Sequence, residues 1–303
     1  MDKPPTRFTV KNLERPTRLD RVISEQVPEL GRRAIQTLVT SRKVKVGERV
    51  VWLCSWQVKN GDRIEIRAEL ESRKTPPKKH FDDAWVVAQE SEFLVVDKPQ
   101  GVLSHGTRAD NEGDLLTLAI ARFGPLFLFH RLDRDTSGLV LLTRNGPINR
   151  YLDTAFKEGS VHKEYWAAVP DSENIAASGV IKARLAPHPK RKSLMMVAER
   201  GGQTAVTNYE VLGRAEGVAL LRLMPETGRT HQLRVHCAHL GGPILGDRLY
   251  GPPKPAAPRL LLHAHRLTLP EQDGYPERRF ETPLPPDFVN ALPETLRDIA
   301  RKG

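Results

Sequence analysis

The chain has 303 residues and a formal net charge of +10, and 39% of its residues are hydrophobic. This length suits one large domain with a small one, and the apolar content is sufficient for a buried core. No apolar run approaches the ~20 residues that span a bilayer, the first residues lack the pattern of a secretory signal, and the two cysteines are far apart. Composition therefore argues against a membrane protein and a disulfide scaffold, and we expect a soluble, cytoplasmic protein with reduced thiols.

The positive charge is concentrated near the N-terminus. Residues 1–80 contain 19 Lys and Arg against 10 Asp and Glu, whereas the rest of the chain contains 28 basic and 27 acidic residues. A basic module of this kind favours contact with the phosphates of a nucleic acid. A solvated basic face without a partner is the alternative interpretation.

Residues 1–15 are predicted to form a tail and residues 16–70 a small domain. Two successive helices are expected there because apolar residues recur at helical spacing. Short strands follow them, with turn signals at Gly47 and at Asn60-Gly61. The apolar positions of the two helices are Leu19, Val22, Ile23 and Leu30, then Ala34, Ile35, Leu38 and Val39, and the polar side of the second helix has Arg32, Gln36, Thr40 and Lys43, which suit a phosphate backbone.

Residues 71–80 include two adjacent prolines and are predicted to be a linker, and residues 81–303 form the larger domain. Runs such as "HKEYWAAV" and "GVALLRLMP" predict strands. Strands outnumber helices and do not alternate strictly with them, which indicates an α+β fold with a mixed, mainly antiparallel central sheet. Helices are expected after Asp114, between Pro147 and Gly159, and after Thr230 as an N-cap.

Two charged segments interrupt the apolar pattern of this domain. The first, "FLFHRLDRDTSGLVLLTRN", places its charges between two runs that predict strands, and a loop held at both ends presents side chains rigidly. In the alternative interpretation this loop has no functional role: Asp135 forms an Asx turn and the arginines are only solvated. The second, "MPETGRTHQLRVHCAHLGG", places Arg229, His231 and Arg234 near a helix N-terminus. An aspartate paired with an arginine stays ionised and oriented, as a nucleophile requires, although a structural salt bridge has the same sequence signature.

Several motifs together indicate a family. "HRLDRDTSGLVLL", "VHKEYWAAV", "GRTHQLRVH", "PILGDRLYG" and "LLLHAHRL" closely resemble the RluA-type pseudouridine synthases, from about "FLVVDKPQGVLSHG" to "LPPDF". The resemblance implies conversion of selected uridines in structured RNA to pseudouridine, without a cofactor, on a central mixed sheet with a deep basic cleft. In the small domain, "GRRAIQTLV" and "VKNGDRIEI" resemble an S-four-like RNA-binding domain, although "KVKVGERV" lacks the Asn usually found before its glycine.

The resemblance also implies roles for individual residues. It identifies Asp133 of "HRLD" as the catalytic aspartate, Tyr165 of "KEY" as the residue that stacks on the target base, and Arg234 of "HQLR" as the partner of the aspartate. Leu233 is the apolar residue beside that arginine, and Arg131 is implicated in filling the gap left by the flipped nucleotide. The other residues expected to contact RNA are His130, Arg229, His231, Arg32 and Lys43. The family's usual His-Pro pair after "LHAHRL" is missing, which puts only a peripheral loop in doubt.

Other functions remain open at this point. Asp133 and Asp135 could form a glycosidase pair, but that chemistry needs a separation of about 5 Å or more across a sugar, for which two alternate residues are only weakly suited. An RNA-binding protein without catalysis is a further alternative. The expected substrate is large-subunit ribosomal RNA, with transfer RNA as the alternative, and the expected enzyme is a monomer without a metal. The carboxylate of Asp133 could attack the base, attack the ribose or remove a proton from C2′ to open a glycal route.

A zinc site is weakly suggested by His231, His236, Cys237 and His239, whose spacing matches no common zinc motif.

Overall fold

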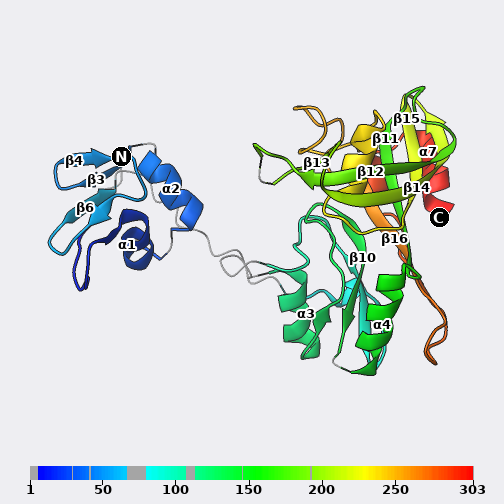
Figure 1. Cartoon of the computed structure of the whole chain (residues 1–303), viewed down its shortest axis with the longest axis horizontal. Coiled ribbons are helices and arrows are strands. Elements are labelled where there is room, and N and C mark those ends of the chain that lie inside the picture. The colour runs from blue at the N-terminus through cyan, green and yellow to red at the C-terminus, as the bar shows by residue number, and fades with distance from the viewer. Residues whose placement is uncertain are drawn as a thin grey trace. The chain divides into compact units, whose positions relative to one another are not determined.

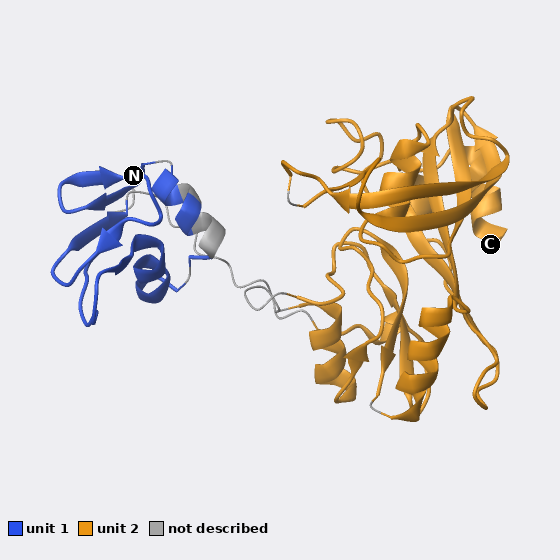
Figure 2. Ribbon diagram, in the orientation of Figure 1, with its two compact units in different colours: residues 1–78 blue, residues 79–303 orange. Residues whose placement is uncertain are grey.

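The protein consists of two compact units, residues 1–78 and residues 79–303 (Figures 1 and 2). We call them the N-terminal unit and the C-terminal unit. The predicted linker lies outside the described residues, apart from His80. The structure is a computed structural model that describes residues 6–28, 30–40, 42–66, 80–106, 113–144, 146–191 and 193–302.

The N-terminal unit places two helices against a small antiparallel sheet with the strand order β1-β6-β3-β4. The predicted order of helix, helix and then short strands holds from α1 onwards, but β1 and β2 come before the helices. The described apolar side chains of both helices pack into the core, with Leu19, Ile23 and Val39 fully enclosed and Leu38 partly buried. The elements are β1 Thr6–Thr9, β2 Thr17–Arg18, α1 Leu19–Gln26, α2 Arg32–Thr40, β3 Val44–Val46, β4 Arg49–Val51, β5 Gln57–Val58 and β6 Arg63–Ile66.

The prediction of a tail over residues 1–15 is wrong for its central part. β1 pairs antiparallel with β6, so that Phe8 lies opposite Ile64. Val10, which follows the strand, is 2% exposed and belongs to the core. A run of β-branched and aromatic residues favours a strand, and β6 offers it an edge that would otherwise leave backbone groups unpaired.

The C-terminal unit is built on a large, mainly antiparallel sheet, which confirms the predicted α+β class. Its strand order is β13-β12-β14-β15-β11-β16-β10-β8-β7, with β17 beside β16 and β9 beside β10, and β10 and β16 are parallel. The strands are β7 Val86–Gln89, β8 Phe93–Lys98, β9 Phe127–Leu128, β10 Ser137–Thr143, β11 His162–Pro170, β12 Ser178–Pro187, β13 Met195–Val197, β14 Gln203–Ala215, β15 Val218–Pro225, β16 Leu262–Leu269 and β17 Arg278–Glu281.

Helices cover both faces of the sheet where β8 and β10 lie, with α3 and α4 on opposite faces (Figure 1). β10 is therefore buried at every position, which explains its continuous apolar run. Among the described residues, no helix is long and apolar enough to cross a membrane. The helical segments are the 3₁₀ turn η1 Asp83–Trp85, α3 Leu115–Phe123, α4 Pro147–Glu158, α5 Gln232–His239, α6 Pro286–Asn290 and α7 Glu294–Lys302.

Two of the three predicted helix starts agree with the structure and one does not. Asp114 accepts a hydrogen bond from the backbone of Thr117 at the start of α3, and α4 begins at Pro147. The start of α5 was expected at a Thr230 cap, but the N-cap residue is His231, in the left-handed region at φ 54°, with no side-chain cap. The carboxamide of Gln232 binds the preceding turn instead, accepting from the backbone of Arg229.

The charged loop, residues 129–136, connects β9 to β10 and enters the sheet at Gly138. Gly138 has φ +115°, and a Cβ there would lie 2.3 Å from the carbonyl oxygen of Ala264 in the parallel neighbour β16. Only glycine fits this approach. The end of the charged loop is thereby fixed against the centre of the sheet.

Candidate active site

The charged loop is anchored from beneath by polar side chains of the preceding segment. The Lys98 ammonium is fully buried and donates to three backbone carbonyls, including those of Val102 (2.8 Å) and Arg134 (3.2 Å). Burial lowers the pKa of Lys98 to about 7. The Ser104 hydroxyl donates to the carbonyl of Leu132 at 2.8 Å and accepts from its backbone N–H. These bonds hold the loop on both sides of Asp133.

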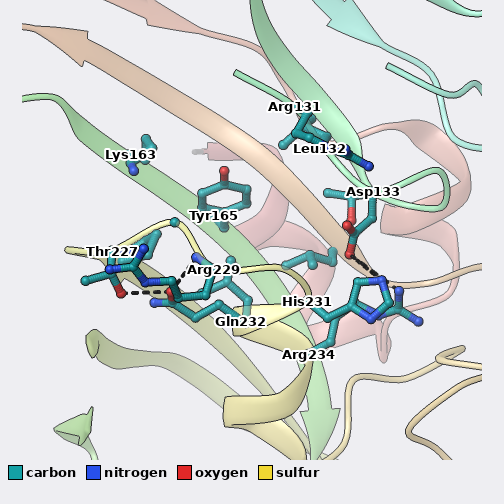
Figure 3. A pocket seen from close by; sticks show the side chains of 15 residues that line it. Arg131, Leu132, Asp133, Lys163, Tyr165, Thr227, Arg229, His231, Gln232 and Arg234 are labelled. Atoms are coloured by element: carbon teal, nitrogen blue, oxygen red, sulfur yellow. Dashed lines mark hydrogen bonds and ion pairs between the residues drawn. The ribbon is translucent and has the colours of Figure 1, made fainter. Parts of the chain in front are cut away.

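Asp133 faces the guanidinium of Arg234, which comes from α5 (Figure 3). Arg234 Nη1 lies 3.4 Å from Asp133 Oδ2, and the Asp133 side chain is 24% exposed. The tighter partner of Arg234 is Asp247, which receives two hydrogen bonds of 2.8 and 2.6 Å and is fully buried. Burial alone would raise the pKa of Asp247, but Arg234 and the backbone N–H groups of Leu249 and Tyr250 hold it below its ordinary value. Arg234 is thus fixed by one carboxylate and presented to another.

His231 links Asp133 to Tyr250. The Tyr250 hydroxyl accepts from the backbone N–H of Met195 and lies 2.8 Å from Nδ1 of His231. Nε2 of the same ring lies 3.8 Å from Asp133 Oδ2. Burial lowers the pKa of His231, although the charge of Asp133 opposes this. The ring thus stands between the Tyr250 hydroxyl and the Asp133 carboxylate.

Tyr165 provides an aromatic wall for the same pocket. It lies in β11, between Leu223 of β15 and Ala264 of β16. Burial and the charge of Asp133 both raise the pKa of its hydroxyl, which therefore stays protonated at neutral pH. Figure 3 shows Tyr165 and Asp133 lining one pocket from β11 and the charged loop. The pair offers a ring for stacking and a carboxylate for reaction.

The pocket is small, about 110 Å³, and opens into a larger groove of about 810 Å³. The small pocket suits a flat group rather than a whole nucleotide, whereas the groove has the volume of a typical ligand site. Both cavities are bordered by Arg131, Lys163, Tyr165, Thr227, Gly228 and Arg229.

The structure brings most of the predicted site residues together around this pocket, namely Asp133, Tyr165, Arg234, Arg131, Leu233, Arg229 and His231. His130 lies apart from the Asp133 pocket: its Nε2 accepts from the backbone of Leu141, its ring stacks on Phe156, and burial lowers its pKa to about 4. It borders the adjoining groove instead. Lys43 and Arg32 belong to the N-terminal unit, and the side chain of Arg32 lies outside the described residues.

The geometry gives little support to the glycosidase pair or to the zinc site that the sequence left open. Asp135 does not line the pocket, so Asp133 has no second carboxylate across it from the charged loop. Within the described residues, no group of three His, Cys, Asp or Glu side chains is placed to hold a metal ion. His236 binds the hydroxyl of Thr207, and burial raises the pKa of the Cys237 thiol to about 12.

Comparison with known proteins identifies the family. Residues 92–239 match the RNA pseudouridylate synthase family. The chain is 31% identical to the ribosomal large subunit pseudouridine synthase D of Haemophilus ducreyi, over 94% of this chain and 92% of that protein. It is 32% identical to the protein of the same name from Pasteurella multocida, over 92% and 91%. The chain belongs to the RNA pseudouridylate synthase family.

A solved structure agrees with this assignment. The human RNA pseudouridylate synthase domain containing 1 has 27% identity and a TM-score of 0.58, covering 72% of this chain and 94% of the human chain. This pseudouridine synthase is therefore an isomerase, and its large sheet is the family fold. The resemblance recognised from "HRLD", "KEY" and "HQLR" is confirmed.

Three residues of this synthase site escaped prediction from the sequence. Asp247 and Tyr250 stand in "PILGDRLYG", and Lys98 stands in "VVDKPQG". Both segments contributed to the resemblance, but neither suggested a role for its charged residue. A signal was present, because an Asp after the apolar "PIL" and a Lys that ends an apolar strand are charges in segments that favour burial, and buried charges need partners.

Proposed function

We propose that this pseudouridine synthase isomerises uridines of large-subunit ribosomal RNA, with the carboxylate of Asp133 as the reacting group. The substrate is supported by the relatives, which are named as ribosomal large subunit enzymes and align over most of the chain. The reacting group is supported by one arrangement: the partly exposed Asp133 faces the Tyr165 pocket and is oriented by Arg234, whose own charge is balanced by buried Asp247.

The isomerisation requires few functional groups from the protein. The bond from ribose C1′ to N1 breaks, the base turns, and C1′ joins C5. The proton of C5 is lost and N1 gains one, so that no electrons or water are exchanged overall. A carboxylate that is ionised and held in place is suited to start this reaction, whether it attacks the base, attacks the ribose or removes a proton from C2′. We accordingly propose that the enzyme uses no cofactor.

The other pocket residues have separate roles in binding the base and the RNA. The Tyr165 ring is placed to stack on the target uracil after the nucleotide has left the helix. Arg131 and Arg229 border both the pocket and the groove. Arg131 is placed to fill the gap left in the RNA by the flipped nucleotide, and Arg229 to bind RNA phosphates. Arg234 orients the Asp133 carboxylate through the 3.4 Å contact between its Nη1 and Asp133 Oδ2.

The test follows the loss of the C5 proton that accompanies pseudouridine formation. Tritium release from uridine C5 of unmodified ribosomal and transfer RNA should occur with the wild-type enzyme on ribosomal RNA and should disappear with Asp133→Asn. Mapping of pseudouridines in cells with and without the gene then identifies the sites. Release only from transfer RNA would make that RNA the substrate, and release by Asp133→Asn near the wild-type rate would refute the role of Asp133.

A further inference from the structure

The hairpin of β3 and β4 in the N-terminal unit exposes a tryptophan. Trp52 is 53% exposed, whereas Val44 and Val51, on the inner side of the same hairpin, are fully buried in the core. Val50 is 39% exposed and lies opposite Lys45 in the register. Trp52 is the first residue after β4, follows the buried Val51 and is exposed as Val50 is. The core of the unit therefore does not need this ring.

One basic side chain lies against the ring, and two more stand close to it in the sequence. The guanidinium of Arg42 lies over the Trp52 ring, 5.8 Å from its centroid. Lys43 is exposed and immediately precedes β3, in which Lys45 lies opposite Val50. Within the described residues neither Arg42 nor Lys43 has a carboxylate partner, and the only acidic residue of the hairpin is Glu48, in its turn. We call the set Arg42, Lys43, Lys45, Val50 and Trp52 the hairpin face.

The backbone of Arg42 is the second, independent observation. Arg42 has φ 61°, in the left-handed region. Its N–H donates to the carbonyl of Val39, and the N–H of Lys43 donates to that of Leu38. This is the hydrogen-bond pattern with which helices commonly end on glycine. Arginine is less favourable than glycine at this position, and a side chain kept in an unfavourable backbone conformation is a candidate for a functional role.

We propose that the hairpin face binds an unpaired nucleobase of RNA, stacked on Trp52, with Arg42 and Lys43 on the flanking phosphates. An aromatic ring beside basic side chains is the usual platform for single-stranded nucleic acid, and positive charge without carboxylate partners complements phosphate. A protein partner is the other class that could bind an exposed aromatic ring beside an arginine, and the experiment below distinguishes it from RNA. The proposal takes its partner from the proposed function, since it assumes that the enzyme acts on RNA.

The experiment compares binding by full-length variants to two fluorescein-labelled probes, a single-stranded oligouridylate and a blunt RNA duplex of equal length. Trp52→Ala should weaken binding of the oligouridylate about 5- to 150-fold, and Trp52→Phe much less, because its ring still stacks. Neither should change duplex binding appreciably. Quenching of tryptophan fluorescence by the oligouridylate should be smaller in Trp52→Phe than in the wild type, which places the base at this ring.

Arg42→Gly separates a binding role from a structural one. Because glycine relieves the left-handed strain, this variant should unfold at the same or a higher temperature while it binds both probes more weakly. Its slope of log affinity against log salt for the oligouridylate should fall by about 0.7 for each lost phosphate contact.

Phe127→Ala is the matched control for Trp52→Ala, since Phe127 is also 53% exposed but lies in the C-terminal unit. This variant should bind both probes as the wild type does.

Wild-type affinity of Trp52→Ala for the oligouridylate would overturn the proposal and assign the ring to a partner of another class. Because the readout is binding and not tritium release, a chain that binds as expected but forms no pseudouridine would refute the proposed function and leave the hairpin face intact.

Discussion

Asp247→Asn tests whether the active-site arginine is held by a carboxylate that does not take part in the reaction. The substitution keeps the shape of the side chain and removes its charge. Asp247 and Arg234 are 0% and 4% exposed, and two hydrogen bonds of 2.8 and 2.6 Å join them. Removing one member of a buried ion pair costs about 3–5 kcal/mol. Because Asp133 remains 3.4 Å from Arg234 and partly compensates its charge, we expect a loss near the lower end of that range.

Thermal unfolding of the full chain measures this loss. A change of about 3 kcal/mol should lower the melting temperature of the C-terminal unit by roughly 6–12 °C, given its size. Asp298→Asn is the control, since Asp298 is 74% exposed and pairs with Arg301 at 3.5 Å, and it should melt as the wild type does. An Asp247→Asn protein that also melts with the wild type would refute the assignment of Arg234 to this buried pair.

The same pair predicts a dependence on pH. The folded pKa of Asp247 lies below its ordinary value of 3.8, so its contribution to stability is complete above pH 3.8 and is lost as pH falls through the folded pKa. The difference in unfolding free energy between wild type and Asp247→Asn should therefore be constant near neutrality and should shrink below about pH 4. A difference that grew in acid would contradict the sign of the shift.

Other substitutions address the reacting groups and the N-terminal unit. Asp133→Asn should abolish tritium release while RNA affinity stays within a few fold, whereas Asp135→Asn should keep substantial activity because Asp135 does not line the pocket; the reverse outcome would exchange their roles. Tyr165→Phe keeps the stacking ring, so RNA should bind normally, and a slower turnover would show that the hydroxyl assists proton movement. Deletion of residues 1–75 should leave a folded, active C-terminal unit with weaker RNA binding and a shallower salt dependence, measured by titration at several salt concentrations; unchanged affinity and slope would show that this unit does not bind the RNA.

Local signals in the sequence are sufficient for much of the fold. The helices at α3 and α4 follow from an Asp cap, an N-terminal proline and a terminal glycine, which act within a few residues of themselves. The α+β class follows from the balance of strand and helix patterns. Asp133, Tyr165 and Arg234 were found through motif resemblance, and the structure places all three at one pocket.

Contacts between distant segments required the tertiary structure. Asp133 and Arg234 are separated by 101 positions, and the pairing of Ser137 with His263 makes β10 and β16 parallel. The apolar residues before Asp247 indicate burial, but nothing local shows that its partner is Arg234. The residue type in the sequence is the same whether a charged side chain is solvated or buried. Only the packing of the sheet determines which carboxylate is desolvated and therefore needs a charged or hydrogen-bonding partner.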